Sequence, residues 1–404
     1  MNVIVVGAGV GGLTSAALLH QRGHDVQVIE QATAIGDDGG GMQIVPNAGR
    51  VLAQLGLADA LADVGTIPGH VVLRRWEDDS TLLMRPVGSA SADRHGMPYY
   101  NVHRPDLVGL LLRCLADVPI RLGTTVRAVG DEQSTAVVDL GDGTRHKADV
   151  VIGADGIDSR VSESLFGHQP TQATGMTIYR SLARRCTSPM SPTDVTIRLG
   201  PDAHLLSYAM GVDSRFINLD CIVHEPGTPA DSGIEPGELD ALRAHFAGWS
   251  AQTQALLDTI DAPILKQTFR DRMPLDRWTA GPVALLGDAC HPMMPSSAQG
   301  TCQAIEDAAI LDRCLALPGA DVAQALQRYE ATRRPRAIGL RSRSFIAAER
   351  DHLPDGAEQR TRDRLYAELN DRVRRGLGLI DPLVEYDPLT AELTEPRPTV
   401  RTEI

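Results

Sequence analysis

The sequence predicts an α/β fold in which a mostly antiparallel β-sheet is inserted into a domain built on a parallel sheet, followed by a helical segment. The first thirty residues have the pattern of a strand, a helix and a second strand. Residues 175–266 change to short alternating strands, and the chain is mainly helical and rich in arginine from about Asp321. At 404 residues the chain exceeds one average domain, so two domains are expected.

The composition is typical of a globular protein, with 43% hydrophobic and 23% charged residues. The formal net charge of −13 and the lack of a basic block argue against a nucleic-acid partner. No apolar stretch approaches the ~20 residues of a membrane span, and the glycine-broken N-terminus lacks a signal peptide's basic leader. The six cysteines form no CxxC pair, so we expect free thiols in a cytoplasmic protein, as a monomer or homodimer.

The N-terminal strand–helix–strand unit contains a dinucleotide fingerprint, Gly7-x-Gly9-x-x-Gly12. The first glycine permits a tight turn, the second lets the backbone approach a pyrophosphate, and the third allows close helix–strand packing. Glu30, eighteen residues after Gly12 at the end of the second strand, is placed to accept ribose hydroxyls, which favours NAD or FAD over NADP. The fingerprint predicts a Rossmann-like domain and does not separate NAD from FAD.

Turn signals divide the next part of the chain into short elements. We expect two short helices, a hairpin around Asp78–Ser80, a helix that begins at Arg104–Pro105, and several strands with a turn at Gly141–Gly143, the last ending at Asp155–Gly156.

The inserted sheet should contain the strands "DVTIRLG", "HLLSYAM" and "FINLDCIV", followed by a polar loop over residues 225–237 and a helix. The predicted division has three parts. A discontinuous cofactor domain comprises residues 1–70, 101–174 and 267–345; a substrate domain comprises 71–100 and 175–266; and a helical segment and tail comprise 346–404. The last twenty residues are expected to be loosely packed.

The segment "LLGDACHPMMPSSAQG" admits four interpretations. Neighbouring residues on an extended strand point in opposite directions, which argues against Cys290 and His291 as a metal site or as a nucleophile–base pair. A plain loop stays possible. In the fourth interpretation the segment contacts a long cofactor: Gly287–Asp288 ends a strand, Pro292 and Pro295 form a rigid floor, and Gly300 opens a helix whose positive end suits an anionic ring.

Three motifs in this order, "GAGVGG…E", "GADGIDS" and "LLGDACHPM…AQG…AIEDAAIL", make residues 1–345 resemble the single-component FAD-dependent aromatic hydroxylases. These are enzymes of the para-hydroxybenzoate hydroxylase type, and the similarity is greatest to the salicylate and 6-hydroxynicotinate hydroxylase branch. The resemblance implies tightly bound, non-covalent FAD and NAD(P)H as a transient co-substrate. It also implies hydroxylation of a small activated ring, such as a hydroxy- or aminobenzoate or a hydroxypyridine, by O₂ through an adduct at flavin C4a.

The resemblance also implies roles for particular residues. It assigns Gly7, Gly9 and Gly12 to the pyrophosphate, Glu30 to the adenosine ribose, Arg104 to the phosphate and ribityl region, and Val126 to the adenine. It assigns Asp155–Gly156 to FAD and the nicotinamide donor, Asp288 to the ribityl chain, and Pro292 and Gly300 to the flavin ring. No metal is expected.

The sequence departs from the family pattern at three places. Ser162 stands where an arginine is usual after the Asp-Gly motif, which leaves the donor contact uncertain. Residues 36–41 are richer in glycine than usual. Gln43 occupies the position of a histidine in 6-hydroxynicotinate hydroxylases, as in salicylate-type members, and this weakens a pyridine substrate.

The general base is expected in the substrate domain. His204 and Tyr208 are four residues apart on one strand, so they should face the same side, and related hydroxylases have a His and a Tyr at matching positions. His291 is the other candidate.

Other functions stay open. They are a different enzyme on the same FAD fold (a natural-product tailoring hydroxylase, a reductase or a halogenase), a non-catalytic FAD module, or an NAD dehydrogenase. The three tryptophans do not form the WxWxIP signature that halogenases share.

Overall fold

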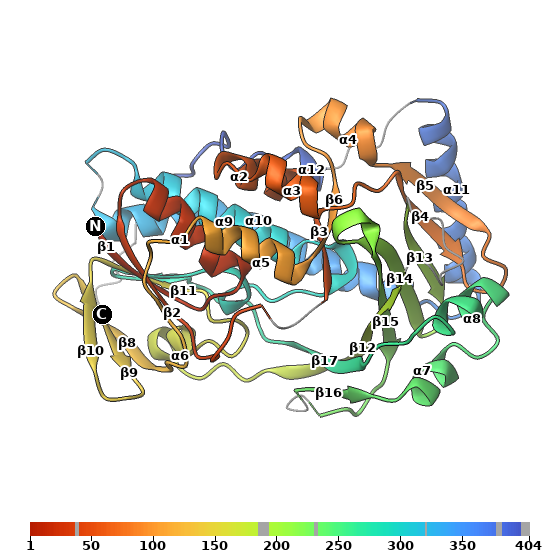
Figure 1. The fold of residues 1–404 in the computed structure, drawn as a ribbon, viewed down its shortest axis with the longest axis horizontal. Helices are drawn as coiled ribbons and strands as arrows, with labels where there is room; N and C mark the ends of the chain where they lie inside the picture. The colour runs from red at the N-terminus through yellow and green to blue at the C-terminus, as the bar shows by residue number, and fades with distance from the viewer. Residues whose placement is uncertain (37–39, 185–193, 230–232, 320, 377–381, 397–404) are drawn as a thin grey trace, which may run out of the picture.

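The computed structural model describes residues 1–36, 40–184, 194–229, 233–319, 321–376 and 382–396. It has an α/β body at one end and a large β-sheet at the other, with the long helix α10 (Val322–Asp351) running between them (Figure 1). Residues 37–39, within the predicted glycine-rich connection, and Cys186 lie outside the described residues.

The first sheet has six strands in the order β18-β19-β11-β1-β2-β7, all parallel except the edge pair β18–β19. Its central strands are rich in valine and isoleucine and almost wholly buried, as strands covered on both faces must be. This confirms the predicted strand–helix–strand unit. The bounds are β1 (Asn2–Val6), β2 (Asp25–Ile29), β7 (Ile120–Arg121), β11 (Val150–Gly153), β18 (Thr279–Ala280) and β19 (Val283–Leu285).

Helix α1 packs against both α5 and α9 on one side of this sheet, and α10 packs on α9. The three-stranded antiparallel sheet β8–β10 and helix α6 pack together and contact strands β1 and β11. The bounds are α1 (Val10–Gln21), α2 (Pro46–Gln54), α3 (Ala58–Val64), α5 (Arg104–Arg113), α6 (Arg160–Phe166), α9 (Gly300–Leu315), β8 (Val126–Glu132), β9 (Thr135–Leu140) and β10 (Arg145–Ala148).

The second large sheet has eight strands in the order β16-β17-β12-β15-β14-β13-β4-β5, and only the β13–β4 pair is parallel among its described pairings. The prediction of an inserted, mostly antiparallel sheet is therefore confirmed, and the hairpin around Asp78–Ser80 forms its edge. The predicted loop over residues 225–237 is wrong at its end, where residues 234–237 pair as an edge strand. The bounds are β4 (His70–Arg75), β5 (Thr81–Pro86), β12 (Gln172–Arg184), β13 (Asp194–Gly200), β14 (Ala203–Met210), β15 (Phe216–His224), β16 (Ile234–Gly237) and β17 (Ile264–Asp271).

The two faces of this sheet have different neighbours. Outward side chains such as Leu205 and Leu219 form a core with α7 (Leu239–His245) and α8 (Ala251–Leu257). The alternate residues of β14, His204 and Tyr208 among them, lie on the inner face, toward α10 and the first domain. The small sheet β3 (Gly41–Ile44) with β6 (Tyr100–His103) joins the two domains, because the Gly41 N–H donates to Asn218 Oδ1 at 2.9 Å.

The C-terminal part is helical, with α11 (Ala357–Arg374) and α12 (Pro382–Glu385) following α10, and α4 (Gly88–His95) lies near the same end (Figure 1). The prediction of a loose tail is wrong for residues 385–396. Arg313 donates to the carbonyls of Pro388 and Ala391, at 2.7 and 2.8 Å, and Leu389 and Leu393 pack on the main core. The sequence does not indicate this contact, because its donor, Arg313, lies on a helix that is far from residues 385–396 in the chain.

Among the described residues, no helix combines the length and apolar character that crossing a bilayer requires.

Candidate active site

A cleft of about 330 Å³ opens at the carboxyl ends of β1, β11 and β19, and we call it the dinucleotide cleft. The first turns of α1 and α9 both border it, and neither helix has a side-chain cap or an acidic residue in its first turn. Free N–H groups at two helix N-termini favour an anionic ligand. The residues that line the cleft are Gly9, Val10, Gly11, Met42, Arg104, Ala154, Gly156, Leu286, Gly287, Asp288, Gly300, Thr301 and Ala304.

The fingerprint glycines meet different surroundings. A Cβ on Gly7, which has φ +104°, would lie 2.4 Å from the Ala154 carbonyl oxygen, and one on Gly12 would lie 2.0 Å from the Gly7 carbonyl oxygen. A Cβ on Gly9 would meet no protein atom within 4 Å. Gly7 and Gly12 therefore permit the close packing of the turn, while Gly9 keeps the cleft open.

Glu30 follows β2 and reaches back to the glycine turn. Its carboxylate accepts hydrogen bonds from the N–H of Ala8 at 2.7 Å and of Ala32 at 2.8 Å. The Glu30 carbonyl accepts from the N–H of Thr124, two residues before Val126. The structure therefore brings Glu30 and the start of β8 to one end of the glycine turn.

The Gly287–Asp288 turn forms the opposite wall. Gly287, with φ +64°, begins a 3₁₀ turn over Gly287–Ala289, and Asp288 lines the cleft. Solvent reaches the carboxylate through the cleft, yet the dense surrounding protein raises its pKa. Within the described part of the chain, nothing donates a hydrogen bond to this carboxylate, so it is available to a ligand's hydroxyl groups.

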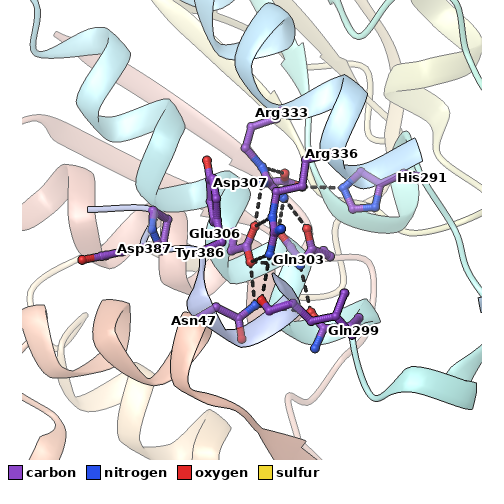
Figure 2. Close-up of polar contacts among 12 residues, drawn as sticks. Asn47, His291, Gln299, Gln303, Glu306, Asp307, Arg333, Arg336, Tyr386 and Asp387 are labelled. Atoms are coloured by element: carbon purple, nitrogen blue, oxygen red, sulfur yellow. Dashed lines mark hydrogen bonds and ion pairs between the residues drawn. The ribbon is translucent and has the colours of Figure 1, made fainter. Parts of the chain in front are cut away.

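Asp307 of α9 holds this turn in place from beneath. Its carboxylate accepts from the Gly287 N–H at 3.0 Å, from His291 Nε2 at 2.6 Å and from Arg333 Nε at 2.7 Å. The ion pairs with His291 and Arg333 lower the pKa of this buried carboxyl to about 2. Figure 2 shows Asp307 between His291 and Arg333. The turn that presents Asp288 is thus held by a carboxylate that does not line the cleft.

Glu306, next to Asp307, carries the rest of this buried network (Figure 2). It accepts from Arg333 and Arg336 of α10 and from the Asn47 amide. Arg336 also lies 4.0 Å from the ring of Tyr386 in the C-terminal segment. The network ties α9, α10 and the C-terminal segment to the Gly287–Asp288 turn.

An extended strand would point Cys290 and His291 in opposite directions, and this expectation is wrong. The 3₁₀ turn brings both side chains beside Asp307, and one potential metal-ligand atom of each of the three residues lies within 4.8 Å of the others. The two Asp307 oxygens already accept three hydrogen bonds, and burial raises the pKa of the Cys290 thiol well above its usual value. The described contacts therefore make this group an ion-pair network.

The segment after the turn separates the cleft from a larger space. Pro292 is buried and lines none of the three cavities described here, whereas Ser296, Ser297 and Gln299 line a cavity of about 610 Å³, which we call the sheet cavity. Gln299 borders the sheet cavity and Gly300, the first residue of α9, borders the dinucleotide cleft. The two spaces therefore border consecutive residues of the chain.

The sheet cavity lies on the inner face of the large sheet, beneath α10. Much of its wall is apolar, and its polar groups include four arginines, Tyr99, Tyr366, His95, Asp351, Gln299 and three serines. Sequence patterns missed these residues because they come from strands, loops and helices far apart in the chain. They include Val45, Val71, Leu73, Leu83, Arg85, Arg94, Tyr99, Ile197, Arg343, Ala347 and Arg350.

His204 and Tyr208 share the inner face, as predicted, but have different environments. His204 Nδ1 lies 2.6 Å from Nε2 of His352 at the end of α10, and both rings are buried. Tyr208 lies beneath β3, where a Cβ on Gly41 would come within 2.5 Å of its hydroxyl. Burial raises the pKa of Tyr208 well above its usual value.

Three other expected residues are placed as follows. The Asp155 carboxylate accepts from Ser159 Oγ at 2.6 Å and the Val161 N–H at 3.1 Å, so it holds the start of α6, and Gly156 faces the cleft instead. Gln43 is buried on β3 with its Nε2 unpartnered. Arg104 lines the cleft, and its backbone N–H donates to the Gly40 carbonyl at 3.0 Å.

This fold and cleft define a dinucleotide-binding protein with a separate large, mostly antiparallel sheet. A family model described as an FAD-binding domain matches residues 1–344, and the chain belongs to this family of FAD-dependent aromatic monooxygenases. The orphaned Gln43 amide, the open Gly9 and the two uncapped helix N-termini fit FAD.

Relatives whose similarity extends over most of this chain are monooxygenases. The chain is 36% identical over 365 residues to a 3-amino-4-hydroxybenzoate 2-monooxygenase of Streptomyces platensis, covering 90% of this chain and 91% of that protein. It is 35% identical to a 6-hydroxynicotinate 3-monooxygenase of Pseudomonas fluorescens, covering 83% and 88%. The protein is therefore a flavoprotein monooxygenase.

Solved structures show the same fold. HpxO of Klebsiella pneumoniae, complexed with FAD and uric acid, superposes with a TM-score of 0.81 at 26% identity, covering 93% of this chain and 95% of that chain. A salicylate hydroxylase substrate complex gives a TM-score of 0.80 at 24% identity, covering 96% of each chain, and shows the fold alone.

Proposed function

We propose that this monooxygenase uses NAD(P)H and O₂ to hydroxylate a small aromatic ring that carries a hydroxyl or amino group and a carboxylate. The named relatives act on 3-amino-4-hydroxybenzoate and 6-hydroxynicotinate, which share these groups. We also propose that the protein works in a reducing environment, because the five cysteines that the structure describes are free thiols.

The observation that carries the proposal is that the dinucleotide cleft and the sheet cavity border consecutive residues, Gly300 and Gln299. A cofactor that follows the cleft past Asp288 and the start of α9 reaches the edge of a mainly apolar cavity on the substrate sheet. Apolar walls exclude water and position a flat ring, and FAD supplies the oxygen chemistry when bound.

The residues proposed to hold FAD are Gly7, Gly9, Gly12, Glu30, Arg104, Gly287, Asp288 and Gly300, with Val126 and Gln43 at the two ends of the cofactor. Gly7 and Gly12 act by shaping the turn, and each of the other residues lies at the cleft or beside it. We assign Asp155 and Pro292 to holding the walls, because neither lines the cleft.

On the substrate side we propose Tyr208 as the group that contacts the ring, because its hydroxyl lies beneath Gly41 of β3, the residue before Met42, which lines the dinucleotide cleft. We propose a packing role for His204, whose imidazole is enclosed against His352. The predicted division of the chain is kept, with its last boundary moved from residue 345 to the end of α10 at Asp351.

The test is a panel of hydroxybenzoates, aminobenzoates and hydroxypyridines assayed with the FAD-loaded enzyme. Substrate-stimulated NADH or NADPH oxidation should accompany O₂ uptake and a hydroxylated product identified by mass spectrometry. Tyr208→Phe should lower hydroxylation at unchanged FAD content, while His204→Asn should keep product formation. Oxidation that yields only peroxide with every compound argues against the proposal.

A further inference from the structure

Among the described residues, the structure contains one buried arginine that forms no ion pair, although the carboxylates of Asp155, Asp158 and Asp288 act on its charge from a greater distance. Its buried arginines within the described residues are Arg198, Arg272, Arg333 and Arg362. Three of them form ion pairs: Arg198 with Asp79, Arg333 with Glu306 and Asp307, and Arg362 with Asp363. Arg272 is 4% exposed and has no described carboxylate within ion-pair distance. Burying a cation without a partner is costly, so this exception indicates a ligand.

Within the described part of the chain, the hydrogen bonds of Arg272 leave one of its three nitrogens, Nε, without a partner. Its Nη1 donates to the Ile157 carbonyl at 3.4 Å, and its Nη2 donates to the carbonyls of Asp288, at 3.2 Å, and Ala289. These carbonyls are neutral dipoles, and the buried Nε–H has no acceptor. A guanidinium in this state offers both its charge and a hydrogen bond to an anion.

Arg272 lines a cavity of about 320 Å³ that is separate from the dinucleotide cleft and the sheet cavity. Two other charged residues line this cavity. Asp271 is paired with Arg341, and Glu349 is exposed, so Arg272 is the buried charged residue of the wall that has no ion pair among the described residues. Much of the remaining wall is apolar, from Pro170, Ala173, Met176, Met294, Phe345 and Ala348. One cation in an apolar, aromatic-lined space matches an aromatic carboxylate.

We propose that this cavity is a second binding site, for an aromatic carboxylate, with the carboxylate on Arg272 Nε and the ring among Met176, Met294 and Phe345. Met294 lines this cavity while Ser296 and Ser297 line the sheet cavity, so the same segment separates the two cavities. The choice of aromatic acids rests on the proposed function. The buried arginine without an ion pair and the apolar wall are independent of it.

Helix α10 offers a matched pair of variants, because Ala347 lines the sheet cavity and the adjacent Ala348 lines the Arg272 cavity. Benzoate is the probe, since it lacks the hydroxyl or amino group that activates a ring. Calorimetry and a crystal structure of the FAD-loaded enzyme should show two benzoate molecules per chain. Ala348→Leu should remove the molecule at Arg272, and Ala347→Leu should remove the one in the sheet cavity.

Charge is tested separately. Arg272→Gln should weaken benzoate at this site by about tenfold or more, as expected for loss of a charge-assisted hydrogen bond, and neutral benzamide should bind the wild type as weakly. If Arg272→Gln fails to fold, Ala348→Leu still decides the question.

A wild-type enzyme that binds only one benzoate, which Ala348→Leu leaves in place, overturns the inference, and so does acetate binding at Arg272 as tightly as benzoate. Failure of the proposed function is distinguished by the substrate panel. Two benzoate sites with no hydroxylated product would contradict that function and leave this site standing.

Discussion

At the scale of single residues, the glycines of the fingerprint contribute through different physical effects, although the sequence shows them as one motif. Gly12 lies against the backbone of Gly7, so its missing side chain allows the turn to form. Gly9 faces open space in the cleft, so its missing side chain leaves room for a ligand.

This difference predicts opposite defects for two alanine variants. Gly12→Ala should destabilise the apoprotein, because its Cβ would lie 2.0 Å from a carbonyl oxygen. Gly9→Ala should melt like the wild type and bind FAD at least ~10-fold more weakly, because the methyl group keeps the pyrophosphate from the backbone. Thermal unfolding of apoprotein and flavin fluorescence titration measure the two effects. Equal melting temperatures for the two variants would refute the distinction.

Asp288 gives a second prediction at this scale. Its carboxylate lines the cleft with no described hydrogen-bond donor, so Asp288→Ala should remove a contact to FAD without exposing an unpaired protein group. The loss of a charge-assisted hydrogen bond corresponds to ~10- to 100-fold weaker FAD binding. Asp288→Asn is the control and should lose less, and full FAD occupancy of the alanine variant in dilute solution would exclude the assigned role.

At the scale of elements, the buried network makes α9 and α10 one unit. Arg333 is fully buried and neutralises both Glu306 and Asp307, and Asp307 in turn fixes the Gly287–Asp288 turn. The cofactor wall therefore depends on a helix that does not line the dinucleotide cleft.

Replacing Arg333 should accordingly lower the stability of the folded protein strongly. Arg333→Met leaves two buried carboxylates without their shared partner and should lower the free energy of unfolding by about 3–5 kcal/mol. Arg328→Met is the control on the same helix: Arg328 pairs with the exposed Glu395, and its loss should cost less than about 1 kcal/mol. Urea unfolding at pH 7 measures both, and similar losses would contradict the network's importance.

The sequence predicted well those elements whose signal is local. Hydrophobic alternation and turn residues located β1, α1, β2 and the β4–β5 hairpin, and the order of three motifs indicated FAD. It failed where partners are distant. Nothing near Asp307 in the chain announces Arg333, and the 3₁₀ turn that brings Cys290 and His291 together differs from the extended strand that their neighbours suggested. The Arg272 cavity is likewise formed by segments far apart in the chain.

At the scale of the whole molecule, the end of α10 is held on the eight-stranded sheet by a pair of buried imidazoles. His352 lies against His204 of β14, with ring centroids 4.8 Å apart, and its carbonyl accepts from the Asp202 N–H at 3.2 Å. Burial lowers the pKa of His352 to about 4 and that of His204 well below its usual value. Both rings are therefore neutral in the folded protein at pH 7.

This contact predicts a loss of stability in mild acid. The unfolded chain takes up protons on these histidines near pH 6.5 and the folded protein does not, so stability is complete above about pH 6.5 and falls as the pH drops toward 4. For His352 alone the loss reaches about 3 kcal/mol. The neighbouring Asp351, whose pKa burial raises to about 6, acts in the opposite direction, so wild type and variant must be compared.

His352→Gln should therefore flatten the dependence of the free energy of unfolding on pH between 7 and 4.5, even though the variant is less stable at pH 7. Replacing the exposed His168 with Gln should leave that dependence unchanged. Urea unfolding at four pH values in this range provides the measurement. A variant slope as steep as that of the wild type would mean that the imidazole pair takes up its proton without separating α10 from the sheet.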